Sequence, residues 1–129
     1  MNEPIWIEHL DVEVMHEQQI AEHGGSHGVR DEGLLLAALA RPRNLFQHGE
    51  NVDLAALAAS YGFGIAKNHA YIDGNKRVAF VVMATFLLVN GRRIRASEPQ
   101  VVTVMLAVAD GTMGEEALAA WLREHVTPG

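Results

Sequence analysis

A short polar segment, residues 69–77, contains the side chains best suited to chemistry. It reads His-Ala-Tyr-Ile-Asp-Gly-Asn-Lys-Arg and directly precedes the most apolar stretch of the chain, residues 78–89. A helix that is apolar on every side normally lies in the centre of a protein. Packing such a helix does not require this density of polar residues at its start, so we expect the functional site here.

The start of the apolar helix is suited to binding an anion. We predict that this helix begins near Gly74 or Asn75, so that the N–H groups of Gly74, Asn75 and Lys76 lack helical acceptors and face outward. Lys76 and Arg77 add positive charge, and arginine can bind two phosphate oxygens at once. Cations at a helix start oppose the helix dipole, so a bound anion is expected to offset them.

Two further side chains of the segment add acid–base and metal-binding capacity. The imidazole of His69 is a suitable base near neutral pH. The carboxylate of Asp73 could share Mg²⁺ with phosphate oxygens, and it could also cap the following helix. A lone histidine is more often structural, but its place in this segment favours a functional role. The combination predicts transfer of a phosphate-containing group.

The remaining pattern predicts an all-α fold in which one compact bundle of about six helices surrounds a buried central helix. We expect a single domain over residues 1–129. Its helices are expected near residues 7–22, 31–40, 53–67, 74–90, 97–109 and 112–125, with capping boxes at the start of the last two.

Three details of these helices can be tested against a structure. The first helix is expected to bury Ile7, Leu10 and Val14, and Pro42 is expected to prevent continuation of the second. In the third helix, capped by Asn51 or Asp53, two glycines at residues 62 and 64 remove side chains and allow another helix to approach closely.

Composition excludes several classes of function. The chain has 129 residues, of which 49% are hydrophobic and 20% charged, with a net charge of −6. This balance indicates a globular protein and argues against direct nucleic-acid binding through bulk charge. The absence of cysteine excludes disulfides, thiolate zinc sites and cysteine nucleophiles. The apolar stretch is too short for a membrane span and the N-terminus lacks a targeting pattern, so we expect a cytoplasmic protein without membrane partners.

A second cluster of possible metal ligands occurs in the first helix. His9, Glu13 and His16 are spaced so that they could face one ion. The sequence from His16 begins like the HExxH zinc motif but lacks its second histidine. We therefore favour a structural role for these residues.

The polar segment also resembles a known family. His69-x-Tyr71-x-Asp73-Gly74-Asn75-x-Arg77 is similar to the core motif of the Fic superfamily, HxFx[DE]GNGRxxR. It is more similar to the motif of the Doc ("death on curing") branch, HxFxDxNKR. Flanking positions also resemble that branch, at residues 24–25, 28–31, 34–35, 40–42 and 67–68.

This resemblance implies a helical enzyme that uses ATP and Mg²⁺. Fic proteins usually transfer AMP to a target hydroxyl, whereas similar Doc toxins phosphorylate elongation factor Tu and stop translation. By position, His69 would be the base and Asp73 the Mg²⁺ ligand. The nucleotide phosphates would be held by Gly74, Asn75, Lys76 and Arg77.

Two departures from the Fic motif favour the kinase. Lys76 replaces the second glycine and should fill the space of the α- and β-phosphates during AMP transfer. Phe80 replaces a second arginine, so one phosphate ligand is missing. Smaller departures are Tyr71 for phenylalanine and Val78 for a common threonine. AMP transfer, and a non-catalytic module that binds an antitoxin, stay open as alternatives.

The resemblance also implies how such an enzyme is controlled. Many Fic proteins contain an inhibitory [ST]xxxE[GN] helix, and residues 112–117 fail to match its last position. Doc proteins lack this helix and are inhibited by an antitoxin, Phd. We therefore expect a Phd-like partner whose disordered tail folds on binding.

Overall fold

The computed structural model describes residues 1–129 and is almost entirely helical, as predicted. Six helices are joined by short loops, and two three-residue strands form an antiparallel ribbon near the C-terminus. The elements are α1 (His9–His23), α2 (Glu32–His48), α3 (Leu54–Asn68), α4 (Asn75–Val89), β1 (Arg92–Ile94), α5 (Glu98–Asp110), α6 (Glu115–His125) and β2 (Val126–Pro128).

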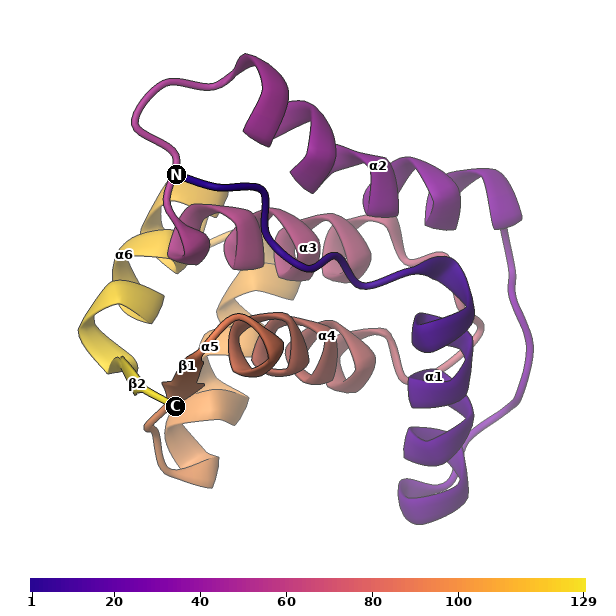
Figure 1. Ribbon diagram of the computed structural model, residues 1–129. Helices are drawn as coiled ribbons and strands as arrows, with labels where there is room; N and C mark the ends of the chain where they lie inside the picture. Colours follow the sequence, from indigo (N-terminus) through magenta and orange to yellow (C-terminus); the bar gives the residue numbers. More distant parts are fainter.

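Helices α3 and α4 lie side by side in the middle of the molecule (Figure 1). Helix α2 packs along α3, α6 covers another side of α3, and α1 packs against α4 near the loop that connects α3 to α4. A Cβ atom added to Gly62 would lie 2.2 Å from the sulfur of Met83 on α4. The prediction that glycine in the third helix permits close approach is therefore confirmed.

The apolar helix α4 supplies much of the core. Val78, Val82, Met83 and Phe86 are fully buried, and Phe86 packs against the ring of Tyr61 from α3. This confirms the prediction of a buried central helix. None of the helices has the length and apolar character needed to cross a membrane.

The predicted buried face of α1 is wrong at Leu10 and Val14, whereas Ile7, just before the helix, is buried as predicted. Val12, His16 and Ile20 are buried, whereas the side chains of Leu10 and Val14 are 70% and 51% exposed. The prediction followed the apolar residues alone. The structure instead turns α1 so that His16, in register with Val12 and Ile20, contacts the loop before α4.

The predicted end of α2 is also wrong, because the helix continues through Pro42 to His48. A proline inside a helix removes one hydrogen bond and crowds the carbonyl of the residue four positions earlier. The additional turns nevertheless place Leu45 and Phe46 against the core. Their burial offsets the local penalty at Pro42, which is itself buried.

The helix caps were predicted with mixed success. Asp53 caps α3, since its Oδ1 accepts the N–H of Ala56 at 2.8 Å, and Ser97 forms the predicted capping box with Gln100. The capping box predicted at Thr112 is wrong because Gly114 is the N-cap of α6. The Thr112 hydroxyl instead donates to the carboxylate of the last residue of α5, at 2.6 Å.

Candidate functional site

The predicted functional segment forms the loop between α3 and α4, and a second loop holds it in place. Arg30 and Asp31 donate their backbone N–H groups to the carbonyl of Ala70, at 2.7 and 3.0 Å. Ile72 donates its N–H to the carbonyl of Gly28 at 3.2 Å. These bonds join the loop between α1 and α2 to residues 69–77, so the backbone of the segment is fixed before any ligand binds.

His69 ends α3 in the left-handed conformation, with φ 52° and ψ 46°. This conformation is unfavourable for a residue with a side chain, on the order of 1–3 kcal/mol. The guanidinium of Arg30 supports it by donating to the carbonyls of His69 and Asn68, at 2.9 and 3.2 Å. The His69 side chain is exposed, so its imidazole is accessible to a second molecule.

Asn75, predicted to hold a phosphate, uses its side chain to close the loop. Its Oδ1 accepts the N–H of Tyr71 at 3.0 Å, and its Nδ2 donates to the Tyr71 carbonyl at 2.9 Å. The Asn75 side chain is buried and fully engaged in this pair of bonds. Only its backbone N–H remains for a ligand.

Tyr71 and His16 form a stacked pair beneath the loop. Their ring centroids are 3.7 Å apart with an interplanar angle of 9°, and His16 Nε2 lies 2.7 Å from the Asp73 carbonyl oxygen. His16 therefore connects α1 to the segment, a role that the sequence analysis missed. The sequence contained one indication of this role, because His16 lies on the same helical face as the apolar residues Val12 and Ile20.

Asp73 is held by the glycine-rich turn after α1 and does not cap α4. Its Oδ2 accepts the N–H of Ser26 at 2.7 Å. Gly25 lies so close that an added Cβ would be 3.2 Å from the Asp73 Cβ. The N-cap of α4 is Gly74, with φ 81°. The Asp73 side chain is exposed, and its Oδ1 accepts no hydrogen bond, so this oxygen is available to a cation.

The start of α4 concentrates positive charge without compensation from within the molecule. The first turn contains no acidic residue, and neither Lys76 nor Arg77 pairs with a carboxylate. Arg77 donates only a long hydrogen bond, 3.3 Å, to the carbonyl of Gly24. The first N–H groups of the helix have no capping side chain. Dipole, N–H donors and side-chain charge all favour an anion at this point.

A cavity of about 570 Å³ opens beside these two cations, between α1, α4 and α5. Lys76 and Arg77 form part of its wall, while Phe80, Met105 and Leu106 contribute apolar surface. Its size and mixed character suit a small-molecule ligand. His69 and Asp73 do not line this cavity and lie in the preceding loop, so the structure places the predicted residues in two adjoining groups.

Comparison with known proteins identifies the family of the chain. Residues 6–87 match the Fic/DOC family, a range that contains the whole loop and the start of α4. The protein Toxin Doc of Mycolicibacterium smegmatis is 40% identical over 90 residues, which cover 69% of each chain. Protein kinase doc of Escherichia phage P1 is 29% identical over 109 residues, covering 84% of this chain and 86% of that protein. The chain therefore belongs to the Fic/DOC family.

Proposed function

We propose that this protein is the toxin of a toxin–antitoxin module and transfers the γ-phosphate of ATP to a hydroxyl of a translation factor, elongation factor Tu. The observation that carries the proposal is the start of α4, where two cations without carboxylate partners meet uncapped N–H groups. The names of the two relatives, a toxin and a protein kinase, agree with this activity. A reaction that uses ATP would take place in the cytoplasm, which is the location we propose.

The ATP phosphates would bind to Lys76, Arg77 and the N–H groups from Gly74 onward. The site also fits Mg²⁺, because the Asp73 carboxylate is exposed and retains a free oxygen. Mg²⁺ is commonly bound by one or two carboxylates together with substrate phosphates. When bound, the ion would neutralise charge on the phosphates during transfer.

His69 is the proposed general base. Its exposed imidazole would accept the proton of the target hydroxyl as the hydroxyl oxygen attacks the γ-phosphorus. One P–O bond forms to the target while the bond to the bridging oxygen of ADP breaks, and ADP leaves with that electron pair. The support from Arg30 would keep the histidine backbone fixed through this step.

Transfer of the γ-phosphate, rather than of AMP, is supported by two side chains in the cavity wall. Lys76 occupies the position of a glycine in the Fic motif, and Phe80 occupies that of an arginine. Phe80 presents an aromatic ring where AMP transfer would have a cationic phosphate ligand, and both residues line the cavity. This arrangement favours an ATP molecule that presents its terminal phosphate.

The proposed partner is a Phd-like antitoxin whose disordered tail folds on this protein. Val102 and Leu106 of α5 are about half exposed and line the apolar side of the cavity. An amphipathic segment could cover them and block the neighbouring nucleotide site. This would provide inhibition in a chain whose residues 112–117 lack the Fic inhibitory motif.

The proposal is tested with purified protein, bacterial lysate and ATP labelled on the α- or the γ-phosphate. We expect γ-label, and no α-label, on one protein that is identified by mass spectrometry as elongation factor Tu. Label from the α-phosphate alone would instead establish AMP transfer. ATP binding without transfer of either label would favour the non-catalytic module. γ-Label on a different protein would support the proposed kinase activity but would show that elongation factor Tu is not its target.

A further inference from the structure

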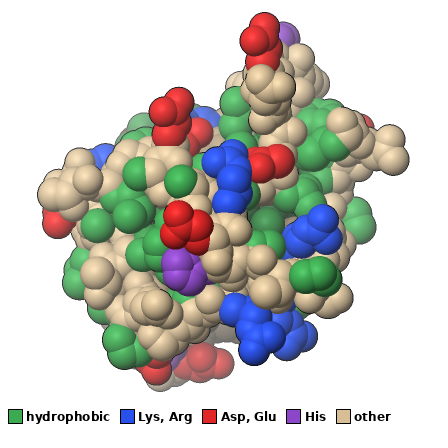
Figure 2. Space-filling view, turned by 90° about the vertical axis from the view of Figure 1, so that its left-hand side faces the viewer, with side chains coloured by type: hydrophobic (Ala, Val, Ile, Leu, Met, Phe, Trp, Pro, Cys, Tyr) green, Lys and Arg blue, Asp and Glu red, His purple; other side chains and the backbone are tan.

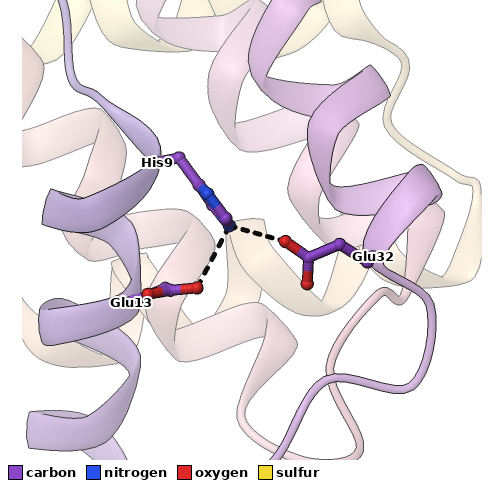
Figure 3. Close-up of side chains that lie close together, drawn as sticks. All are labelled: His9, Glu13 and Glu32. Atoms are coloured by element: carbon purple, nitrogen blue, oxygen red, sulfur yellow. Dashed lines mark ion pairs between the residues drawn. The ribbon is translucent and has the colours of Figure 1, made fainter.

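A second cluster of polar side chains lies between α1 and α2, away from the start of α4. His9 Nε2 is 3.2 Å from Glu13 Oε1 and 3.0 Å from Glu32 Oε1. His9 and Glu13 are one turn apart on α1, and Glu32 is the first residue of α2 (Figure 3). The potential ligand atoms of the three residues lie within 4.8 Å of one another. His9 and Glu13, for which the sequence analysis favoured a structural role, therefore lie close to Glu32 rather than to His16 as third neighbour.

The two separations from His9 Nε2 fit the coordination sphere of a metal ion. Zinc binds imidazole nitrogen and carboxylate oxygen at about 2.0–2.2 Å. Two ligand atoms at that distance, separated by angles of about 90–109°, are roughly 3.0–3.4 Å apart. The measured separations of 3.0 and 3.2 Å from the imidazole nitrogen agree with this value.

The orientation of the imidazole also favours a metal over an ordinary ion pair. His9 Nε2 is itself buried and makes no hydrogen bond, although two carboxylate oxygens are close to it. A protonated imidazole would direct its N–H at one of these oxygens. The nitrogen is therefore a buried polar atom without a hydrogen-bond partner beside two carboxylates, and a metal ion bound to all three groups would satisfy it.

An independent observation comes from Tyr71, in the functional segment itself. Its side chain is 1% exposed and its hydroxyl has no hydrogen-bond partner. The hydroxyl is therefore an unsatisfied buried donor, and it belongs to a ring that stacks against His16, three residues from Glu13 on α1. Such groups are rare unless water, an ion or a ligand completes the site.

We propose that His9, Glu13 and Glu32 bind one transition-metal ion of the zinc class. One imidazole and two carboxylates suit such an ion better than Mg²⁺, which prefers oxygen ligands alone. Three protein ligands leave one position for water. A water at that position is a suitable acceptor for the unpaired Tyr71 hydroxyl. The side chains of the three ligands are 35%, 44% and 52% exposed, so an ion can reach them from solvent.

The ion would connect three parts of the molecule. It would join the start of α1 to the start of α2, and the Tyr71 hydroxyl would link it to the loop between α3 and α4. Tyr71 is in turn bonded to Asn75, the first residue of α4. The site would therefore stabilise the loop separately from the Mg²⁺ site proposed at Asp73.

The test is titration of chelator-treated protein with Zn²⁺ in the absence of ATP. Calorimetry measures the affinity and stoichiometry of Zn²⁺ binding, and thermal unfolding measures the melting temperature with and without Zn²⁺. We expect one Zn²⁺ per chain and a Zn²⁺-dependent rise in melting temperature. His9→Ala and Glu32→Gln should each weaken this binding by more than about tenfold. Circular dichroism will verify that both variants remain folded, since the substituted side chains are partly exposed.

His27→Ala is the matched control. It removes another histidine that contacts a glutamate of α1, at 2.8 Å from Glu17, but one without a third ligand. This variant should bind Zn²⁺ like the wild type. Failure of the wild type to bind Zn²⁺, or equal binding by His9→Ala and the wild type, would overturn the proposal. Because no ATP is present, these results are independent of the proposed kinase activity.

Discussion

Helices α3 and α4 begin in opposite ways, although they lie next to each other in the core. Helix α3 begins after Asp53, whose carboxylate accepts the N–H of Ala56 and receives two hydrogen bonds from Arg123, at 2.6 and 3.0 Å. Helix α4 begins after Gly74, has no capping side chain, and carries two cations in its first turn.

The charged residues at the two helix starts have different roles. Those at α3 stabilise the protein, and we propose that those at α4 bind a ligand. At α3 an acid lies at the positive end of the helix and a base from α6 pairs with it, so the charges are satisfied internally. On the side of the molecule that carries α6, acidic and basic side chains lie next to each other near the centre of the view, and a separate group of basic side chains lies at its lower edge (Figure 2). At α4 the cations oppose the helix dipole and have no carboxylate partner, as expected for the anion site that we propose.

The largest expected effect comes from removing the proposed base of the α4 site. His69→Ala should lower phosphate transfer by about 10²–10⁴-fold, which is the usual contribution of a general base. ATP binding and the free energy of unfolding should change little, because the imidazole is exposed. Single-turnover transfer from γ-labelled ATP measures the effect. Unchanged transfer would remove His69 from the catalytic role.

The next largest effect is expected at the start of α3. Asp53→Ala removes both a helix cap and the ion pair with Arg123, and should lower the free energy of unfolding by about 1–2 kcal/mol. Urea denaturation measures this loss. Transfer activity at a temperature where the variant remains folded should equal that of the wild type. A loss of activity without a loss of stability would contradict the assignment of a stabilising role to the charges at α3 and a ligand-binding role to those at α4.

The ion pair at α3 should also show a defined pH dependence. Hydrogen bonds from Arg123 hold the pKa of Asp53 below its ordinary value. The associated stability is therefore present above the pKa of the unfolded chain, near pH 4, and is lost as the pH falls through the lower folded value. Asp53→Asn preserves capping capacity and removes the charge. Its stability deficit at pH 7 should shrink below pH 4, whereas a constant deficit would exclude the ion pair as the cause.

The smallest expected effect has the opposite sign and occurs at α4. Lys76→Glu replaces a cation that opposes the helix dipole by an anion that favours it, and should raise the free energy of unfolding by about 0.3–1 kcal/mol. The same change should weaken ATP binding. Thermal denaturation with and without ATP measures both quantities. A destabilised variant would show that Lys76 serves the fold.

Several features set by local sequence were predicted, and most features set by distant contacts were not, although the Thr112 capping box and the close approach at Gly62 are exceptions in each direction. The Asp53 cap and the buried helix α4 follow from residues within one or two turns. The buried face of α1 depends on the contact between His16 and Tyr71 on another element. The segment 69–77 was located from its residue types, but the supporting role of Arg30 depends on the path of a separate loop.

Pro42 and Glu32 illustrate the same limit. A local rule predicts that a helix ends before Pro42, but burial of the following residues against the core decides otherwise. Glu32 belongs to a different helix from His9 and Glu13, so spacing along the sequence could not identify it as their neighbour. In both cases tertiary packing supplies the information that the local pattern lacks.

The most direct test of the account compares Arg77→Ala with Arg123→Ala. Each substitution removes one guanidinium, from the start of α4 or from the ion pair at α3. For both variants we would measure ATP affinity by calorimetry and the free energy of unfolding by urea denaturation. The account predicts that Arg77→Ala loses ATP affinity at unchanged stability, and that Arg123→Ala loses stability at unchanged ATP affinity. Equal losses of both properties in the two variants, or the reverse pattern, would contradict it.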